Sequence, residues 1–182
     1  MFATSGLLPG RRHVGKLSII DRRLLDEVSG KAKAAARKRM NYNLHTSEKE
    51  PCNRLLNAME PGTYFVPHFH GDAEKDETMV MLRGRMGMVV FDEKGNVVET
   101  ALLDAAGDIS GVTIPHGVFH SMVVLDPGTV VLEAKAGPYR PLHPQEIAGW
   151  APAPDSPEAP KYLAKLAQLF ANVRKSHGEG RQ

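Results

Sequence analysis

Three histidines and a glutamate have the residue types and the spacing to hold a metal ion. His68 and His70 are one residue apart in "TYFVPHFH". Alternate side chains of a strand point the same way, so two imidazoles at this spacing can ligate one metal from one strand. Glu77 opens the next apolar segment after a charged loop, and His120 ends "PHGVFH" much later in the chain. We predict that the ends of these segments meet at one mouth of a barrel.

This set of donors favours a divalent transition metal without selecting one. Three imidazoles and one carboxylate suit Fe, Mn, Ni, Co or Zn. Four protein ligands on a metal that prefers five or six positions leave room for water or substrate. A metal with such an open position can polarise a carbonyl, lower the pKa of bound water or bind dioxygen. The residue types alone leave these three chemistries open.

The segments that must position these residues read as short strands. Between residues 53 and 135, segments rich in Val, Leu, Met, Phe and Tyr alternate with turn residues, and no helical interval separates them. This pattern predicts an all-β sandwich or barrel. "DEKGN" and "DPG" are the expected turns before residues 97 and 129. The predicted strands are residues 53–59, 63–70, 77–83, 85–92, 96–103, 111–115, 119–125 and 129–135.

Helical segments flank this β region at both ends. Asp21 can cap a helix whose apolar positions continue to a basic end at Lys38 and Arg39. "NYNLH" after it reads as a link to the barrel. We divide the chain into a basic helical extension (1–50), a β-barrel (51–142) and a proline-rich wrap with an amphipathic helix (143–182). That last helix, residues 161–175, should dock on the barrel or on a partner subunit through one apolar stripe, which comprises Leu163, Leu166, Leu169, Phe170 and Val173.

Composition limits the class of protein. The 182 residues are 42% hydrophobic and 24% charged, as in an ordinary soluble protein, and no apolar run approaches a membrane span. Residues 1–50 hold eleven Lys or Arg against five Asp or Glu, but no aromatic residues interleave with these charges, so we expect no nucleic-acid partner. The single cysteine excludes an internal disulfide. A cytoplasmic location is expected, and the C-terminal helix with exposed sheet edges makes a homodimer plausible.

The metal-ligating residues resemble the motifs of the cupin superfamily. The first motif is matched by Gly62, His68 and His70, Glu77, and Gly84, with six residues before the glutamate where three or four are usual. Glu74 would restore the usual gap, but no glycine follows it at the right distance, so Glu77 is preferred and Glu74 is the alternative. The second motif is matched at Pro115, Gly117 and His120, whereas Val124 replaces its asparagine.

The similarity extends beyond these motifs. The segments "ARKRMNYNLH", "RLLNAMEPGTYFVPHFH", "VMLRGRMGMVVFDEKG" and "EAKAGPYRP" look like the WbuC-type family of cupin fold metalloproteins. The resemblance implies a single cupin jelly-roll β-barrel with N-terminal and C-terminal α-helical extensions, mainly β, with one divalent metal on His68, His70, Glu77 and His120. It also implies an association with surface-polysaccharide genes.

Polar residues inside the apolar segments are candidates for a pocket beside the metal. Inward-facing charges need partners and would build a polar site, although alternating charges on a strand commonly face water. His45 lies in a pocket or serves a backbone-bonding turn. The candidate catalytic residues are Tyr64, Glu133 and Lys135, and the candidate substrate-binding residues are Arg39, Asn41, Asn43, His45, Arg54, Asn57, Arg83 and Tyr139.

These observations support three functions. The first is a metalloenzyme that isomerises or epimerises a small polar metabolite, a sugar or nucleotide-sugar, and the sugar follows only from the family resemblance. The second is a non-catalytic module whose metal-centred pocket binds a carboxylate or sugar. The third is an Fe(II) dioxygenase. The sequence does not choose among them.

Overall fold

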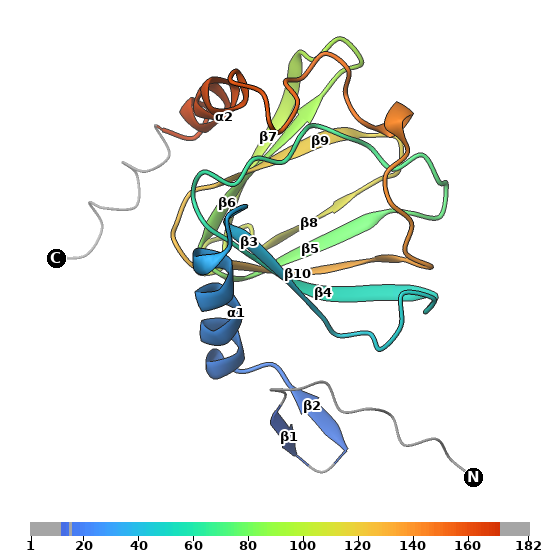
Figure 1. The fold of residues 1–182 in the computed structure, drawn as a ribbon, viewed down its shortest axis with the longest axis vertical. Coiled ribbons are helices and arrows are strands. Elements are labelled where there is room, and N and C mark those ends of the chain that lie inside the picture. The colour runs from blue at the N-terminus through green and yellow to red at the C-terminus, as the bar shows by residue number, and fades with distance from the viewer. Residues whose placement is uncertain (1–11, 15, 172–182) are drawn as a thin grey trace, which may run out of the picture.

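Two antiparallel sheets enclose a common interior in the computed structural model, which describes residues 12–14 and 16–171 (Figure 1). The larger sheet has the order β3-β4-β10-β5-β8, and the smaller has the order β7-β6-β9. This architecture confirms the predicted mainly β jelly-roll barrel. The strands are β3 (Arg39–Asn43), β4 (Cys52–Met59), β5 (Glu77–Arg83), β6 (Arg85–Phe91), β7 (Val97–Asp104), β8 (Gly111–Ile114), β9 (Phe119–Val124) and β10 (Thr129–Ala136).

The inner face of the larger sheet changes from polar to apolar along the strands. At one end, Lys135 pairs with Asn53 on one side and with Glu77 on the other. At the other end, the inner positions are filled by methionines that pack against methionines of the smaller sheet. Methionine suits this irregular space because its side chain is flexible. The apolar cluster comprises Met59, Met79, Met81, Met86, Met88, Leu103, Ile114, Met122, Val124 and Val131.

The outer face of the larger sheet is covered by α1 (Arg22–Ala34). The Asp21 side chain caps this helix by accepting a hydrogen bond from the Leu24 backbone, as predicted. Leu24, Leu25 and Val28 are buried against the sheet. A separate hairpin of β1 (Arg12–Val14) and β2 (Leu17–Ile19) precedes the helix.

The helix ends earlier than expected. Ala35 is already extended and Lys38 has a φ of 56°, so the chain turns and enters β3 at Arg39. The basic Lys38 and Arg39 suited a helix end. Met40 and Tyr42 nevertheless pack beneath α1, while Asn41 between them faces the other way. The alternation is that of an edge strand. The sheet therefore begins at residue 39, before the boundary expected at residue 51.

Residues 63–70 do not form the predicted strand. Pro67 has no N–H to give to a ladder, and only His68 makes isolated bridges, one to His120 and one to Ile147. The segment therefore runs between β9 and a short 3₁₀ turn, η1 (Pro144–Glu146). The side chains of His68 and His70 still lie close together, although they are not on one face of a regular strand.

Two turns show why particular residues were recognisable. The Asp92 carboxylate accepts hydrogen bonds from the Lys94 and Asn96 backbones and closes the "DEKGN" turn. Gly84 joins β5 to β6 with a φ of +74°, and a Cβ there would lie 2.5 Å from the Thr129 hydroxyl oxygen. Glycine is therefore required at this turn.

The C-terminal helix α2 (Ala159–Gln168) packs on the barrel. Leu166 and Phe170 are buried with Val89 and Val123 of the smaller sheet. Leu169 is 44% exposed, so its expected place in the apolar stripe is wrong. Val173 and the end of the predicted helix lie outside the described residues. Within the described chain, each helix is too short or too polar to cross a membrane.

Candidate metal centre

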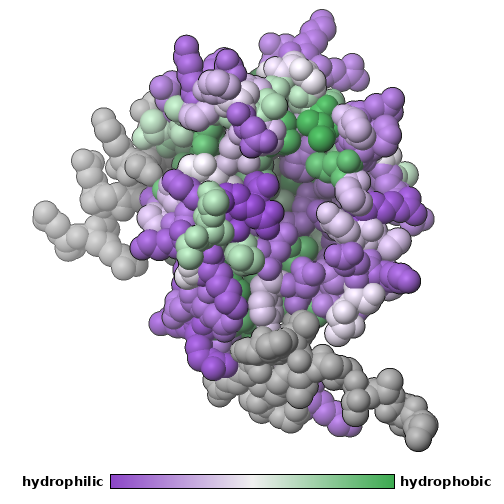
Figure 2. Space-filling view, viewed as in Figure 1, coloured by the Kyte–Doolittle hydropathy of each residue, from purple (hydrophilic) through white to green (hydrophobic). Residues whose placement is uncertain are grey.

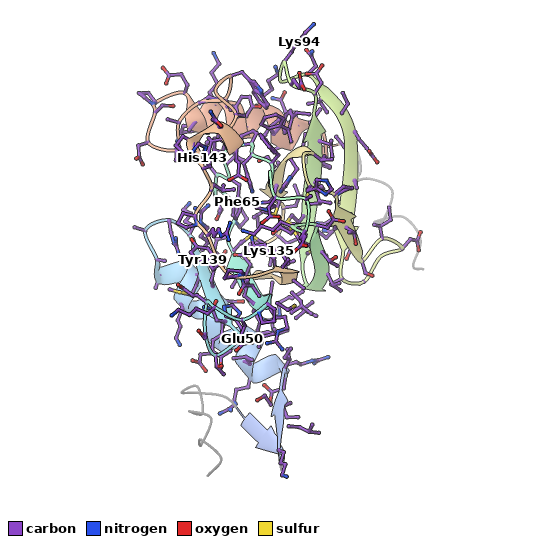
Figure 3. The ribbon with its side chains drawn as sticks, turned by 90° about the vertical axis from the view of Figure 1, so that its right-hand side faces the viewer. Glu50, Phe65, Lys94, Lys135, Tyr139 and His143 are labelled. Carbon is purple, nitrogen blue, oxygen red and sulfur yellow. The ribbon has the colours of Figure 1, made fainter. Side chains whose placement is uncertain are left out.

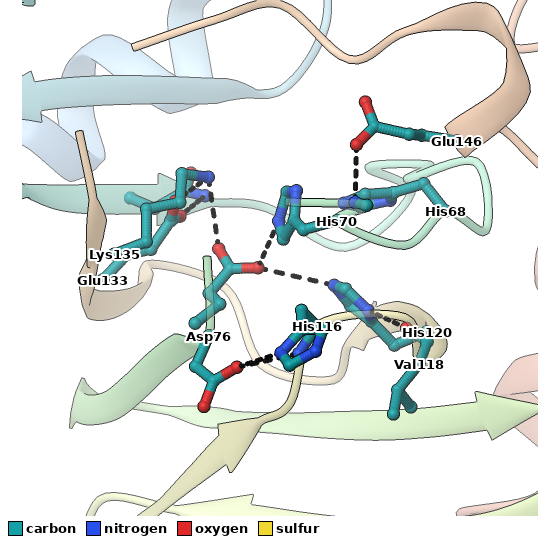
Figure 4. Close-up of polar contacts among 12 residues, drawn as sticks. His68, His70, Asp76, His116, Val118, His120, Glu133, Lys135 and Glu146 are labelled. Carbon is teal, nitrogen blue, oxygen red and sulfur yellow. Dashed lines mark hydrogen bonds and ion pairs between the residues drawn. The ribbon is translucent and has the colours of Figure 1, made fainter. Parts of the chain in front are cut away.

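Four side chains converge at the polar end of the barrel interior. The potential ligand atoms of His68, His70, Glu77 and His120 all lie within 4.8 Å of one another (Figure 4). His70, Glu77 and His120 are buried, and His68 is partly buried. The exposed Glu74 instead lies in the loop, where its backbone bonds to the Asp72 carboxylate. The structure thus places Glu77, and not Glu74, beside the histidines.

Backbone pairing holds these residues together. Glu77 is the first residue of β5, and His120 is the second residue of β9. The backbones of His68 and His120 exchange two hydrogen bonds, of 3.1 and 2.9 Å. On its other side, the 61–76 segment bonds to the C-terminal wrap through Phe69 N to Glu146 O, at 3.0 Å. The histidines are therefore fixed by contacts far apart in sequence.

Second hydrogen bonds orient two of the imidazoles. His68 Nδ1 lies 3.0 Å from the Val66 carbonyl oxygen, and His120 Nδ1 lies 2.9 Å from the Val118 carbonyl oxygen. Because a carbonyl only accepts, each Nδ1 carries the proton and each Nε2 presents a lone pair. Histidine ligands of metals are commonly held in this way.

A buried nitrogen without a hydrogen-bond partner indicates whether a cation fits the cluster. Within the described residues, the buried His120 Nε2 has no hydrogen-bond partner. Its nearest charged neighbour is the Glu77 carboxylate, 3.4 Å away. With the proton on Nδ1, both groups are acceptors, and a cation between them would satisfy both. The residues present therefore fit a divalent metal.

The protonation states agree with this fit. Burial, followed by the neighbouring His120, lowers the pKa of His68 to about 4, so its imidazole is neutral at physiological pH. Burial alone would raise the pKa of the Glu77 carboxyl. The His70 imidazole, whose Nε2 lies 3.0 Å from Glu77 Oε2, and the Lys135 ammonium outweigh burial and hold that pKa well below its ordinary value. The neutral His68 and the ionised Glu77 are in the forms that bind a metal.

A buried ion pair adjoins the cluster. Lys135 Nζ lies 2.7 Å from Glu133 Oε1 and 3.4 Å from Glu77 Oε1. Burial and the Glu77 charge raise the pKa of Glu133 to about 7. Burial lowers the pKa of Lys135, but the charges of Glu133 and Glu77 outweigh it and raise that pKa above its ordinary value. Asn57 Nδ2 donates to Glu133 Oε2 at 3.4 Å.

Most of the remaining predicted pocket residues lie beside the cluster. Arg39, Asn41, Asn57 and Tyr139 line the cavity next to His68, His70 and Glu77, together with Glu133 and Lys135. Asn43 and His45 line an adjoining cavity. The buried His45 Nδ1 lies 2.9 Å from the carbonyl oxygen and 3.1 Å from the amide nitrogen of Arg54, which matches the backbone-bonding alternative.

Three predicted site residues lie elsewhere. Arg54 faces away from Asn53 and Asn57 because strand side chains alternate, and it forms an exposed ion pair with Glu50. Arg83 lies beyond a register shift in the β5–β10 ladder and pairs with Asp26 of α1. These two were wrong as pocket residues.

Tyr64 is also outside the metal cavity, so its predicted catalytic place is wrong. Its hydroxyl donates to the Pro152 carbonyl at 2.9 Å, and its ring meets Tyr162 edge-on. These contacts turn the side chain toward α2. The irregular path of residues 61–70 explains the error, because strand alternation does not apply there.

Sequence reasoning missed several lining residues. Phe65 and Asn53 line the cavity from within, and Arg37, Lys75 and Arg140 line its rim. Asn53 was detectable, because it is four residues from Asn57 on one strand and so shares its face. The rim cations come from turns and loops, where residue spacing carries no such signal.

Comparison with known proteins gives a family model and several fold neighbours. The model of a domain of unknown function (DUF6016) matches residues 20–103. No curated protein matches the chain. A solved structure of KdgF from Halomonas sp. is 19% identical with a TM-score of 0.44, covering 56% of this chain and 82% of that chain.

Two larger proteins match about half of this chain. Oxalate decarboxylase from Bacillus subtilis is 19% identical with a TM-score of 0.41, covering 54% of this chain. The capsular polysaccharide assembling protein CapF from Staphylococcus aureus is 16% identical with a TM-score of 0.42, covering 55% of this chain. The matches span only 24% and 26% of those two chains.

Proposed function

We propose that this protein is a divalent-metal-binding cupin that acts as a metalloenzyme on a small polar metabolite. The observation that carries the proposal is the cluster of His68, His70, Glu77 and His120, whose ligand atoms lie within 4.8 Å of one another. Two of its imidazoles have Nδ1 occupied by backbone carbonyls, and the buried His120 Nε2 has no partner in the described chain. Such a cluster is costly unless a cation completes it.

A metal held there would polarise a bound oxygen of the substrate. The residues around it have separate roles in the proposal. Glu133 and Lys135 line the same cavity and are the groups we assign to proton transfer, because they are the titratable pair next to Glu77. Phe65 and Met122 supply apolar wall that limits the entry of water.

The finer assignment follows the resemblance to WbuC-type cupins. We propose isomerisation or epimerisation of a sugar or nucleotide-sugar, in surface-polysaccharide biosynthesis and in the cytoplasm. The non-catalytic module and the Fe(II) dioxygenase are competing outcomes of the same experiments. A homodimer is also proposed, and sedimentation equilibrium of the full chain would test it.

The metal comes first in testing the proposal. The full chain, purified without added metal, should retain close to one equivalent of Fe, Mn, Ni, Co or Zn by elemental mass spectrometry. Screening sugar phosphates and nucleotide-sugars with and without oxygen then separates the functions. Substrate-dependent oxygen uptake with iron would favour the dioxygenase, and tight binding without turnover would favour the module. Failure to bind any of the five metals would overturn the proposal.

A further inference from the structure

The cavity at the metal cluster has two lobes with a common wall. The inner lobe, of about 240 Å³, is lined by His68, His70 and Glu77, and the outer lobe, of about 500 Å³, lies over β3 and β4. Figure 3 shows Phe65, Lys135 and Tyr139 in this region of the molecule. The face drawn in Figure 2, a quarter turn away, is mostly hydrophilic. The residues common to both lobes are Arg37, Asn41, Asn53, Glu133, Lys135 and Tyr139.

The inner lobe has an excess of positive charge. Five cationic side chains line it, against the two carboxylates Glu77 and Glu133. Lys135 is already held by those carboxylates. The other four cations are Arg37, Arg39, Lys75 and Arg140. None of them forms an ion pair in the part of the chain that the structure describes. The lobe therefore offers cations without counter-charge to a ligand.

Arg39 is the best positioned of these cations. Its guanidinium lies over the Phe65 ring, 4.5 Å from the centroid, and Nη1 donates to the Tyr64 carbonyl at 3.0 Å. These contacts fix the planar group and leave donors available. A fixed guanidinium matches the two oxygens of a carboxylate or phosphate.

Buried amides in the wall have unused hydrogen-bonding capacity. Asn53 is 3% exposed, and neither its Nδ2 nor its Oδ1 has a partner among the described residues. The Asn57 Oδ1 is unpartnered in the same region. Burying amide groups without partners destabilises a protein, so a ligand that completes them explains their presence. An amide that both donates and accepts suits hydroxyl groups.

We propose that the inner lobe binds a hydroxylated organic anion, a sugar acid or sugar phosphate, with its carboxylate or phosphate on Arg39 and its hydroxyls on Asn53 and Asn57. This inference rests on the proposed function, since it names the substrate class for the same site. It excludes a neutral sugar as the preferred ligand.

Calorimetric titration of the full metal-loaded chain tests the substrate class. The probes are gluconate, glucose 6-phosphate and glucose. At least one acid should bind about 10-fold or more tightly than glucose, as expected for a hydrogen-bonded charge. Preference for gluconate identifies a carboxylate, and preference for glucose 6-phosphate identifies a phosphate. Equal binding of glucose, or no binding of either acid at millimolar concentration, overturns the proposal.

Two variants test the assigned residues. Arg39→Gln should weaken binding of the preferred acid about 10-fold or more and leave glucose unaffected. The matched control, Arg54→Gln, removes an arginine that lies outside the cavity and should change neither. Unchanged affinity in Arg39→Gln would count against the proposal.

Asn53→Leu separates a ligand-binding role from a structural one. Leucine has nearly the same shape and removes the unpaired amide, so the ligand-free variant should melt at a higher temperature and bind the acid more weakly. A lower melting temperature with unchanged acid binding would show that Asn53 is structural. This outcome would overturn its assignment.

Metal content distinguishes this inference from the proposed function. Each variant is assayed for bound metal, and the wild-type chain is titrated again after chelation. Arg39-dependent acid binding in a chain that binds no metal would retain the inference and refute the metalloenzyme. Normal metal content with no preference for acids would refute this inference and leave the metalloenzyme proposal intact.

Discussion

The two ends of the barrel interior differ in whether their buried side chains find partners within the protein. At the apolar end, Met59, Met79 and Met86 are 1% exposed or less and belong to one packed cluster. At the polar end, Asn53 is 3% exposed and His120 is 1% exposed, but the Asn53 amide and the His120 Nε2 lack partners within the described residues. The same strands build both ends, so the difference arises from side chains and not from backbone.

The contrast separates stability from function. The apolar end contributes to folding by removing methionines from water. The polar end costs folding free energy until a cation and a ligand complete its hydrogen bonds. Truncations at the apolar end should therefore lower stability and leave binding unchanged, whereas loss of a ligand-binding group at the polar end should weaken binding. The following experiments test that division.

Met86→Ala should have the largest effect on stability. Met86 is fully buried at the apolar end, and its truncation should lower the free energy of unfolding by about 2–5 kcal/mol. Urea denaturation measures this loss. Metal content per folded molecule should not change. Val97→Ala, at a position 42% exposed, is the control and should fall within about 0.5 kcal/mol of wild type. Loss of metal in Met86→Ala would break the division between the ends.

Glu77→Gln should have the largest effect on metal affinity. The change removes the only carboxylate of the described cluster. Loss of a group that merely hydrogen-bonds to a metal ligand can weaken metal binding ~100-fold, so loss of this ligand should weaken it by at least as much. Competition with a chelator measures the affinity. Glu74→Gln, in the neighbouring loop, is the matched control and should bind normally. The reverse result for this pair would assign the ligand to Glu74.

Metal should stabilise the protein through the polar end alone. At free metal ten times the Kd, the retained metal should add about 1.4 kcal/mol to the free energy of unfolding. Met86→Ala should show the same gain although its starting stability is lower, and Glu77→Gln should show almost none at that concentration. A gain in Glu77→Gln as large as in wild type would place the ion elsewhere.

A satisfied carboxylate near the polar end should give the smallest effect. Glu50 accepts from the Thr46 hydroxyl and backbone, each at 2.7 Å, and these bonds lower its pKa to about 2. Because the folded pKa is depressed, the stabilisation is present above the ordinary value of 4.5 and is lost as pH falls toward 2. The urea midpoints of wild type and Glu50→Gln should therefore differ most near neutral pH and converge in acid. A difference that stays constant with pH would contradict this account.

Sequence patterns predicted the strands better than the surroundings of the site. Alternation of apolar residues marked seven of the eight expected segments, but it could not reveal that Pro67 interrupts the eighth. The edge strand β3 was hidden by Lys38 and Arg39, whose charges suit a helix end. Its position depends on Met40 and Tyr42 packing beneath α1, a tertiary contact.

The metal cluster was predictable because its residue types are rare together, whereas the pocket was not. Spacing states which residues share a face but not which face is inward. Asn57 and Arg54 differ by an odd number, so both could not line the cavity. Arg83 shares the parity of Glu77, yet the register shift between Val130 and Val131 turns it to the outer face. Local irregularities of this kind follow from the whole sheet.

The strap formed by residues 144–148 also determines when the metal centre can be completed during synthesis. His68 and His70 lie between β9 and this strap, with bonds from Phe69 to Glu146 and from Ala148 to Pro67. Chains emerge from the ribosome N-terminus first, so the histidines are synthesised well before the residues that clamp them. The complete centre can form only after residue 148 has emerged. Nascent chains that end earlier would carry the four ligand residues without the clamp that fixes two of them.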